Sequence, residues 1–141
     1  MPSNVEQPRG LSLAGLLVII GLIIALLGTG ALLLGRERAR VRDAVRLMDM
    51  TQFSAAMHLI YSEKGSYATA AQGCSAKGAL MSSCAVSPLL ASINQLKDPS
   101  RFTYLVADVP DADSYAIVFT LEQGYQSYAA GQHVLTQDGI R

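Results

Sequence analysis

The chain has 141 residues, a net charge of +0 and a mean hydropathy of +0.29, with 50% hydrophobic and 16% charged residues. This length suits one domain. The composition is too apolar for a disordered chain and unusual for a small soluble enzyme. The balanced charge gives no sign of a nucleic-acid surface and leaves that partner undetermined. Two cysteines cannot by themselves form a closed zinc site, and the sequence shows no cluster of metal ligands, so we expect no metal ion and no cofactor.

The apolar excess comes from residues 11–34, which contain 24 residues without a charge, 18 of them Ala, Val, Ile or Leu. As a helix this run would extend about 36 Å, and the hydrocarbon core of a bilayer is about 30 Å thick. We therefore expect a membrane span over residues 11–35. A cleaved secretory signal is the alternative, but its apolar region is usually shorter and ends in a small-residue cleavage site. Here an arginine-rich segment follows directly.

Residues 36–64 predict an amphipathic helix that continues the span, because good helix formers dominate and proline is absent. The simplest prediction is one helix from about residue 11 to about residue 63. The apolar stripe expected to cover the rest of the domain consists of Val41, Ala44, Val45, Met48, Ala55, Ala56 and Leu59. A second stripe consists of Phe53, Met57 and Ile60, and either widens that contact or meets a neighbouring chain.

Arginines cluster just after the apolar run. Arg38, Arg42 and Arg46 repeat every four residues and so share one helix face, where like charges repel unless they are compensated. We interpret them as membrane-surface arginines. Two kinds of compensating group stay open: lipid phosphates, and the nearby acids Glu37, Asp43 and Asp49. By the positive-inside rule the cluster favours a cytoplasmic C-terminal side.

Residues 65–84 are small, polar and glycine-rich, which predicts a long loop. A disulfide between Cys74 and Cys84 would stabilise this loop by about 2–3 kcal/mol and would place the domain outside the cytoplasm. Two unpaired buried cysteines are the alternative, and they would suit a cytosolic domain. Ser87 as a cap and Pro88 in the first turn predict a short helix over the following residues up to Leu96.

The last third of the chain has the composition of strands. β-Branched and aromatic residues concentrate in 102–107, 114–122 and 132–136. Turns are predicted between them, over 108–113 and around 124–131. Three strands with short connections favour an antiparallel sheet that the long helix covers on one face. The predicted fold class is α+β, with a globular head over residues 65–141.

We find no residue set that predicts an enzyme. His58 and His133 lack a nucleophile in a recognisable setting. The acids Asp108, Asp111 and Asp113 could offer oxygens to calcium, but the twelve-residue calcium loop and its closing Glu are missing. A solvated turn is the alternative for this acidic run. The sequence therefore favours a structural or assembly protein.

Taken in order, a short polar leader, Arg9-Gly10, an apolar span, an amphipathic helix, a loop and a small sheet resemble the type IV pilin and type II secretion pseudopilin family. Arg9-Gly10 before Leu11 looks like the leader-peptidase site of that family. Three features add to the likeness: the spacing of Tyr61, Gly65 and Tyr67, the Asp-Pro pair in SINQLKDPSRFTYLV, and the strand-like ending of the chain. The resemblance implies a leader over residues 1–10, cleavage after Gly10, N-methylation of Leu11 and a pilin-like fold.

One position departs from the family pattern. The family usually has Glu as the fifth residue of the mature chain, and here that position is Gly15. No carboxylate exists in residues 11–34 that could pair with a neighbouring subunit's amine. Because some minor pseudopilins at filament tips also lack this Glu, the departure favours a minor or initiating subunit.

The resemblance implies a filament subunit of a type IV pilus or a type II secretion pseudopilus. Its expected partners are other pilin-like subunits, a leader peptidase, the inner-membrane assembly platform and the lipid bilayer. Its expected location is the inner membrane, with a single span and the head outside the cytoplasm, and then a surface or periplasmic filament. The alternative function is a single-pass membrane-anchored protein with a small non-catalytic binding domain.

Overall fold

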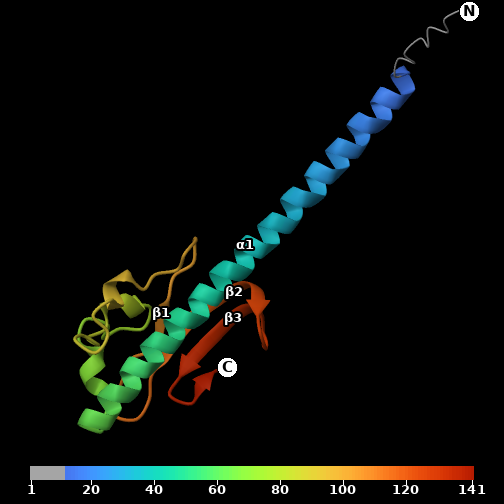
Figure 1. Ribbon diagram of the computed structural model, residues 1–141. Coiled ribbons are helices and arrows are strands. Elements are labelled where there is room, and N and C mark those ends of the chain that lie inside the picture. The colour runs from blue at the N-terminus through green and yellow to red at the C-terminus, as the bar shows by residue number, and fades with distance from the viewer. Residues whose placement is uncertain (1–11) are drawn as a thin grey trace, which may run out of the picture. The chain divides into compact units, whose positions relative to one another are not determined.

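The computed structural model describes residues 12–141, and its main element is helix α1, Leu13–Lys64 (Figure 1). Ser12 caps the start, because its Oγ accepts a hydrogen bond from the N–H of Gly15 at 3.2 Å. At the other end Gly65 has φ +67°, and its N–H donates to the carbonyl of Tyr61 at 2.8 Å. The predicted single long helix is confirmed.

The chain divides into two compact units, one ending at Glu37 and the other running from Arg38 to Arg141. The described part of the first unit is the apolar half of α1. The second unit, which we call the head, contains the remainder of α1 and all the strands.

The head contains a four-stranded antiparallel sheet with the strand order β1-β2-β3-β4 (Figure 1). Its strands are β1 (Leu105–Asp108), β2 (Ala116–Tyr125), β3 (Tyr128–Thr136) and β4 (Gly139–Ile140). Each strand pairs with the next one along the chain. The fold is therefore α+β, as predicted: one long N-terminal helix and a small antiparallel sheet.

The strand boundaries differ from the prediction in two ways. The turn predicted around 124–131 is present but shorter, since β2 and β3 continue into this region and leave a two-residue turn at Gln126 and Ser127. Glycine usually signals a turn, but Gly124 and Gly131 lie at positive-φ positions inside the strands, next to a bulge in β2. The short strand β4 was not predicted.

The segment between α1 and β1 is mostly loop, with three single-turn 3₁₀ helices at Ala68–Ala71, Met81–Ser83 and Ile93–Gln95. The short helix predicted after Pro88 is present only as the 3₁₀ helix Ile93–Gln95, and the residues before it form hydrogen-bonded turns. Part of the loop covers the outer edge of β1. There the N–H of Gly78 donates to the Val106 carbonyl at 2.7 Å, and the N–H of Val106 donates to Ala79 at 2.9 Å.

The core forms where α1 packs on the sheet, and it includes the second predicted stripe, Phe53, Met57 and Ile60, whereas most of the first predicted stripe lies outside it. Ten helix residues are buried, and seven of them follow alternating spacings of three and four: Ala39, Asp43, Arg46, Met50, Phe53, Met57 and Ile60. Four members of the predicted stripe are exposed instead, namely Val41, Met48, Ala55 and Leu59. The first stripe was misplaced because the packed face includes three charged residues, Asp43, Arg46 and Asp49, which hydropathy assigns to solvent.

Candidate functional site

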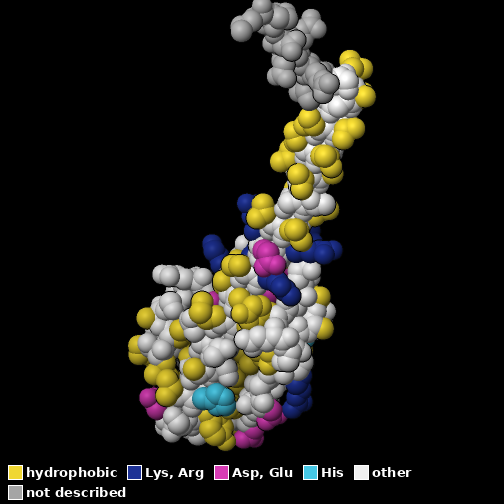
Figure 2. All heavy atoms as spheres, turned by 45° about the vertical axis from the view of Figure 1, so that its right-hand side comes forward, with side chains coloured by type: hydrophobic (Ala, Val, Ile, Leu, Met, Phe, Trp, Pro, Cys, Tyr) yellow, Lys and Arg dark blue, Asp and Glu magenta, His cyan; other side chains and the backbone are white. Residues whose placement is uncertain are grey.

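The most prominent surface feature is the apolar half of α1. Every large hydrophobic side chain between Leu13 and Leu34 is exposed, and this stretch contains no charge. It is long and apolar enough to cross a membrane. In Figure 2 hydrophobic side chains cover this part of the helix, and Lys and Arg side chains gather where it ends. An uninterrupted apolar surface of this size needs lipid or protein around it.

The predicted processing residues Arg9, Gly10 and Leu11 lie outside the described residues, so cleavage and N-methylation stay predictions. Gly15 is described and lies in the first turns of α1. A Cβ on Gly15 would meet only Ser12 Oγ, at an ordinary contact distance of 3.5 Å. The helix therefore has space for a larger side chain at this position.

The three arginines predicted at the membrane surface have different environments. Arg38 is exposed. Arg42 is half-buried and donates to both carboxylate oxygens of Glu122, from Nε at 2.8 Å and from Nη2. Arg46 is fully buried, so its interpretation as a membrane-surface residue is wrong. Its charge is compensated within the head, and of the nearby acids proposed for this role Asp43 is the one that does so.

Arg46 is the centre of a buried polar cluster. Its guanidinium donates to Asp43 at 2.6 Å, to Asp98 through two nitrogens at 2.5 and 2.9 Å, to Ser100 at 2.7 Å and to Glu122 at 2.8 Å. The paired fork on Asp98 is the geometry in which an arginine binds a carboxylate most strongly. The cluster connects three segments that are distant in sequence: α1, the loop before β1, and β2.

Asp43 connects the helix to the bulge in β2. Its Oδ1 accepts from Arg46 and from the N–H of Glu122, and its Oδ2 accepts from the N–H groups of Gln123 and Gly124, at 2.6–3.0 Å. Three consecutive backbone N–H groups thus converge on one fully buried carboxylate. These groups are displaced from the regular β2–β3 ladder by the bulge, and Asp43 satisfies them.

The charges of the cluster stabilise one another. Burial lowers the pKa of Arg46, but its hydrogen bonds to Asp98, Glu122 and Asp43 outweigh burial and leave this pKa above its ordinary value. Burial raises the pKa of Asp98, while the hydrogen bonds from Arg46 and Ser100 bring it below its usual range. The hydrogen bond from Arg42 holds the pKa of Glu122 at about 2, against burial and with help from Arg46. Arg46, Asp98 and Glu122 are therefore ionised at neutral pH.

A second buried polar pair lies beside this cluster. The hydroxyl of Tyr104 donates to Asp49 at 2.8 Å. Burial raises the pKa of Asp49 although the hydrogen bond from Tyr104 opposes it, and the charge of Asp98 raises it further. Asp49 was proposed as a partner for the arginines, but its described partner is Tyr104.

Two members of the buried cluster, Asp98 and Glu122, were not predicted as site residues. Asp98 belongs to the Asp-Pro pair that was noted only as part of a family likeness. For Glu122 the sequence carries no local signal, because its contacts with α1 span about 80 positions of the chain.

The other predicted sites lie elsewhere in the head. Cys74 and Cys84 form a disulfide, as predicted. Asp108 pairs with Lys77 at 2.6 Å, and Asp111 accepts hydrogen bonds from the backbone N–H groups of Asp113 and Ser114. In residues 12–141 no group of three or more acidic, His or Cys side chains is arranged to hold a metal ion. The acidic run therefore stabilises a turn, and the calcium interpretation is not supported.

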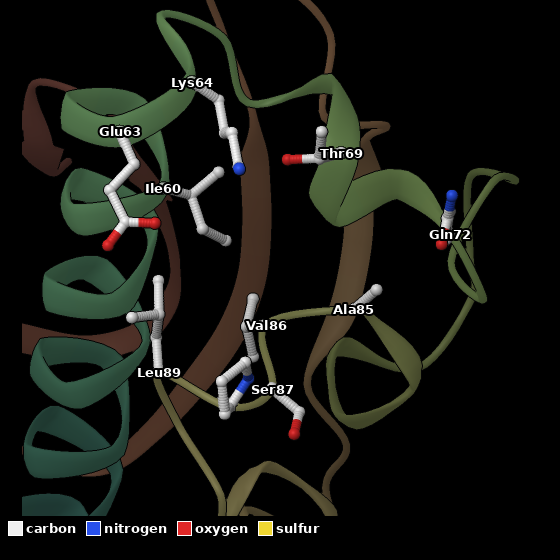
Figure 3. A pocket seen from close by; sticks show the side chains of 10 residues that line it. Ile60, Glu63, Lys64, Thr69, Gln72, Ala85, Val86, Ser87 and Leu89 are labelled. Carbon is white, nitrogen blue, oxygen red and sulfur yellow. The ribbon is translucent and has the colours of Figure 1, made fainter.

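An open pocket of about 500 Å³ lies at the C-terminal end of α1. Figure 3 shows Ile60 and Lys64 of α1 facing Val86 and Thr69, so the floor is apolar and the rim is polar. Its lining includes one acid, Glu63, and one base, Lys64, but neither His nor Cys. This arrangement offers a surface for contact and lacks a nucleophile paired with a base.

Comparisons with known proteins give no relative for the chain: no family model, no curated protein and no solved structure matches it.

Proposed function

We propose that this protein is a membrane-anchored structural subunit of a pilus-like or pseudopilus-like filament, with a non-catalytic head. The observation that carries the proposal is the single helix α1. From Leu13 to Gly35 it is uncharged, apolar and largely exposed, and its later turns contribute to the core of the head. Such a helix is suited to storage in a bilayer and later burial against the helices of neighbouring subunits, since both environments cover the same apolar surface.

The exposed apolar stripe of α1 within the head supports the same proposal. Val41 and Met48 are 64% and 54% exposed, and Leu59 is 49% exposed. These side chains point away from the sheet and leave a helix face available for a neighbouring helix.

For the topology, we propose one span with the head outside the cytoplasm. The disulfide between Cys74 and Cys84 supports this orientation, because such bonds persist in oxidising compartments. The arginines after the span favour the opposite side by the positive-inside rule. Labelling of thiols in intact cells decides between them. We expect that no thiol reacts before reduction. Two free thiols that lie in the cytosol, where the membrane shields them from the reagent, would instead support a plain membrane-anchored binding domain.

N-terminal sequencing of the mature protein tests the proposed processing. We expect a chain that starts at Leu11 with a methylated amine, because the leader is expected to be removed after Gly10. A Gly10→Val variant serves as the control and should keep its leader. An intact Met1 on the wild-type protein, recovered from the membrane fraction, would contradict the proposed function.

We further propose that the subunit is a minor or initiating one, because Gly15 occupies the position where bulk subunits usually carry Glu. The helix has space for this change. Gly15→Glu should raise the amount of the protein in filaments sheared from cells, with Gly15→Gln as the uncharged control. Unchanged or reduced incorporation would count against this role.

A further inference from the structure

The apolar core of the head does not extend along the whole of its helix. The first α1 residue in the buried apolar cluster is Leu47. The buried α1 residues of the head before Leu47 are Ala39, Asp43 and Arg46. The first turns of α1 in the head are therefore held largely by hydrogen bonds and ion pairs.

The tip of the β2–β3 hairpin, residues 122–127, is one of the two segments held in this way. None of its side chains is buried, and it lies between the buried Leu121 and the half-buried Tyr128. Its described side-chain hydrogen bonds to α1 all go to the polar cluster, through Asp43 and through the two arginines that contact Glu122.

The loop of residues 97–103 is the second segment. Its apolar side chains are not buried, and it lies between the buried residues Leu96 and Tyr104. Arg46 holds it through Asp98 and Ser100, and the guanidinium of Arg46 lies 5.2 Å from the centre of the Phe102 ring. One arginine thus joins both segments to the helix.

We propose that the hairpin tip and the 97–103 loop form a strap that opens as one unit, separately from the apolar core, with Asp43 and Arg46 as its latch. Opening the strap exposes no fully buried apolar side chain of either segment, so its cost comes mainly from the polar contacts and from the contact between Arg46 and Phe102. The same opening returns the buried charges to water, which lowers that cost. The core from Leu47 to Ile60 stays packed in the open state.

The proposal requires that the hairpin tip and the 97–103 loop are coupled to each other through Asp43 and Arg46. Asp43 has no hydrogen bond to the 97–103 loop among its described contacts; it reaches that loop through Arg46, which donates to both Asp43 and Asp98. The N–H of Ser100 donates to Asp98 at 2.8 Å and reports on the loop without touching Asp43. Loss of the Asp43 carboxylate should therefore loosen Ser100 only if the two segments open together.

Native-state amide hydrogen exchange on the full chain in detergent micelles tests this proposal, with Asp43→Ala as the variant. We expect the amides of Ser100 and Tyr125 to exchange about tenfold faster, while those of Ile117 and Phe119 in the core keep their wild-type rates. Glu63→Ala, which removes an exposed acid from the same helix, is the matched control and should change none of these rates. If Asp43→Ala does not fold, Asp43→Asn, which keeps one acceptor oxygen, replaces it.

Chemical rescue adds a second measurement. The three N–H groups left by Asp43→Ala form a concave donor site of the kind that binds small anions. Sodium formate should slow exchange at Ser100 and Tyr125, and sodium chloride at equal ionic strength should slow it less. The proposal would be overturned if Asp43→Ala accelerated amide exchange equally in the strap and in the core. It would also be overturned if the faster exchange were confined to residues 122–124, or if formate did not slow it.

Discussion

At the scale of single residues, buried charge distinguishes this head from an ordinary helix-on-sheet domain. Arg46 is fully buried and donates hydrogen bonds to three carboxylates and a hydroxyl. A buried ion pair of this kind contributes geometric specificity more reliably than stability, because desolvation offsets much of the Coulomb attraction. Here that specificity sets which turn of α1 meets the bulge in β2.

Glu122 makes the head sensitive to acid. Because the pKa of Glu122 is about 2 in the folded state and near 4.5 in an unfolded chain, its contribution to stability is complete above pH about 4.5 and disappears as the pH falls toward 2. We expect the unfolding temperature of the full chain in detergent to fall over this window. The Glu122→Gln variant should show a shallower fall there. An identical pH profile for the two proteins would contradict this assignment.

At the scale of elements, the packed face of α1 gives a direct test. Phe53 is fully buried, and Phe53→Ala should lower the free energy of unfolding by about 3–5 kcal/mol, since it removes a large core side chain and leaves a cavity. Met48 belongs to the stripe that hydropathy placed in the core, but it is 54% exposed. Met48→Ala should change stability by less than about 0.5 kcal/mol. Chemical denaturation of both variants measures the difference, and similar losses would contradict the observed helix face.

The bulge in β2 gives a second test at this scale. Gly124 has φ +83°, and a Cβ there would lie 2.5 Å from the carbonyl oxygen of Tyr128. Gly78 has nearly the same φ, +84°, but open space around it. Gly78→Ala should therefore cost only the backbone strain, about 1 kcal/mol, and Gly124→Ala should cost at least about 2 kcal/mol more. Thermal unfolding compares them, and equal losses would show that backbone strain alone matters at Gly124.

At the scale of the whole molecule, the disulfide supports a loop that contains little regular structure. Replacing Cys74 and Cys84 together by Ser should lower the free energy of unfolding by about 2–3 kcal/mol, because the reduced chain regains loop entropy when it unfolds. Chemical unfolding of the variant and of the reduced wild-type protein measures this loss. The losses measured for the variant and for the reduced wild-type protein should agree. An unchanged denaturation midpoint in both proteins would contradict a stabilising role for the disulfide.

Much of the architecture follows from local patterns. The apolar run, the absence of proline from residue 11 to residue 64 and the glycine after it predicted the extent of α1, since helix formation depends on nearby residues. Strand composition predicted three of the four strands, because β-branched and aromatic residues mark half-buried surfaces. The two-residue strand β4 is too short to leave such a signal.

The candidate site was less predictable than the fold. The exposed apolar half of α1 was visible in the sequence because its length and lack of charge are local properties. The buried cluster was not, since hydropathy places Asp43 and Arg46 in solvent and gives no reason to pair them with Asp98 and Glu122.

The sequence by itself determined the α+β class, the long helix, its apolar half and the position of the disulfide loop, because each depends on residues close together in the chain. Only the tertiary structure decided which face of α1 is packed and that an arginine predicted at a membrane surface is a core residue. The physical reason is that a buried charge is tolerated only where partners from distant segments surround it, and their arrival depends on the completed fold.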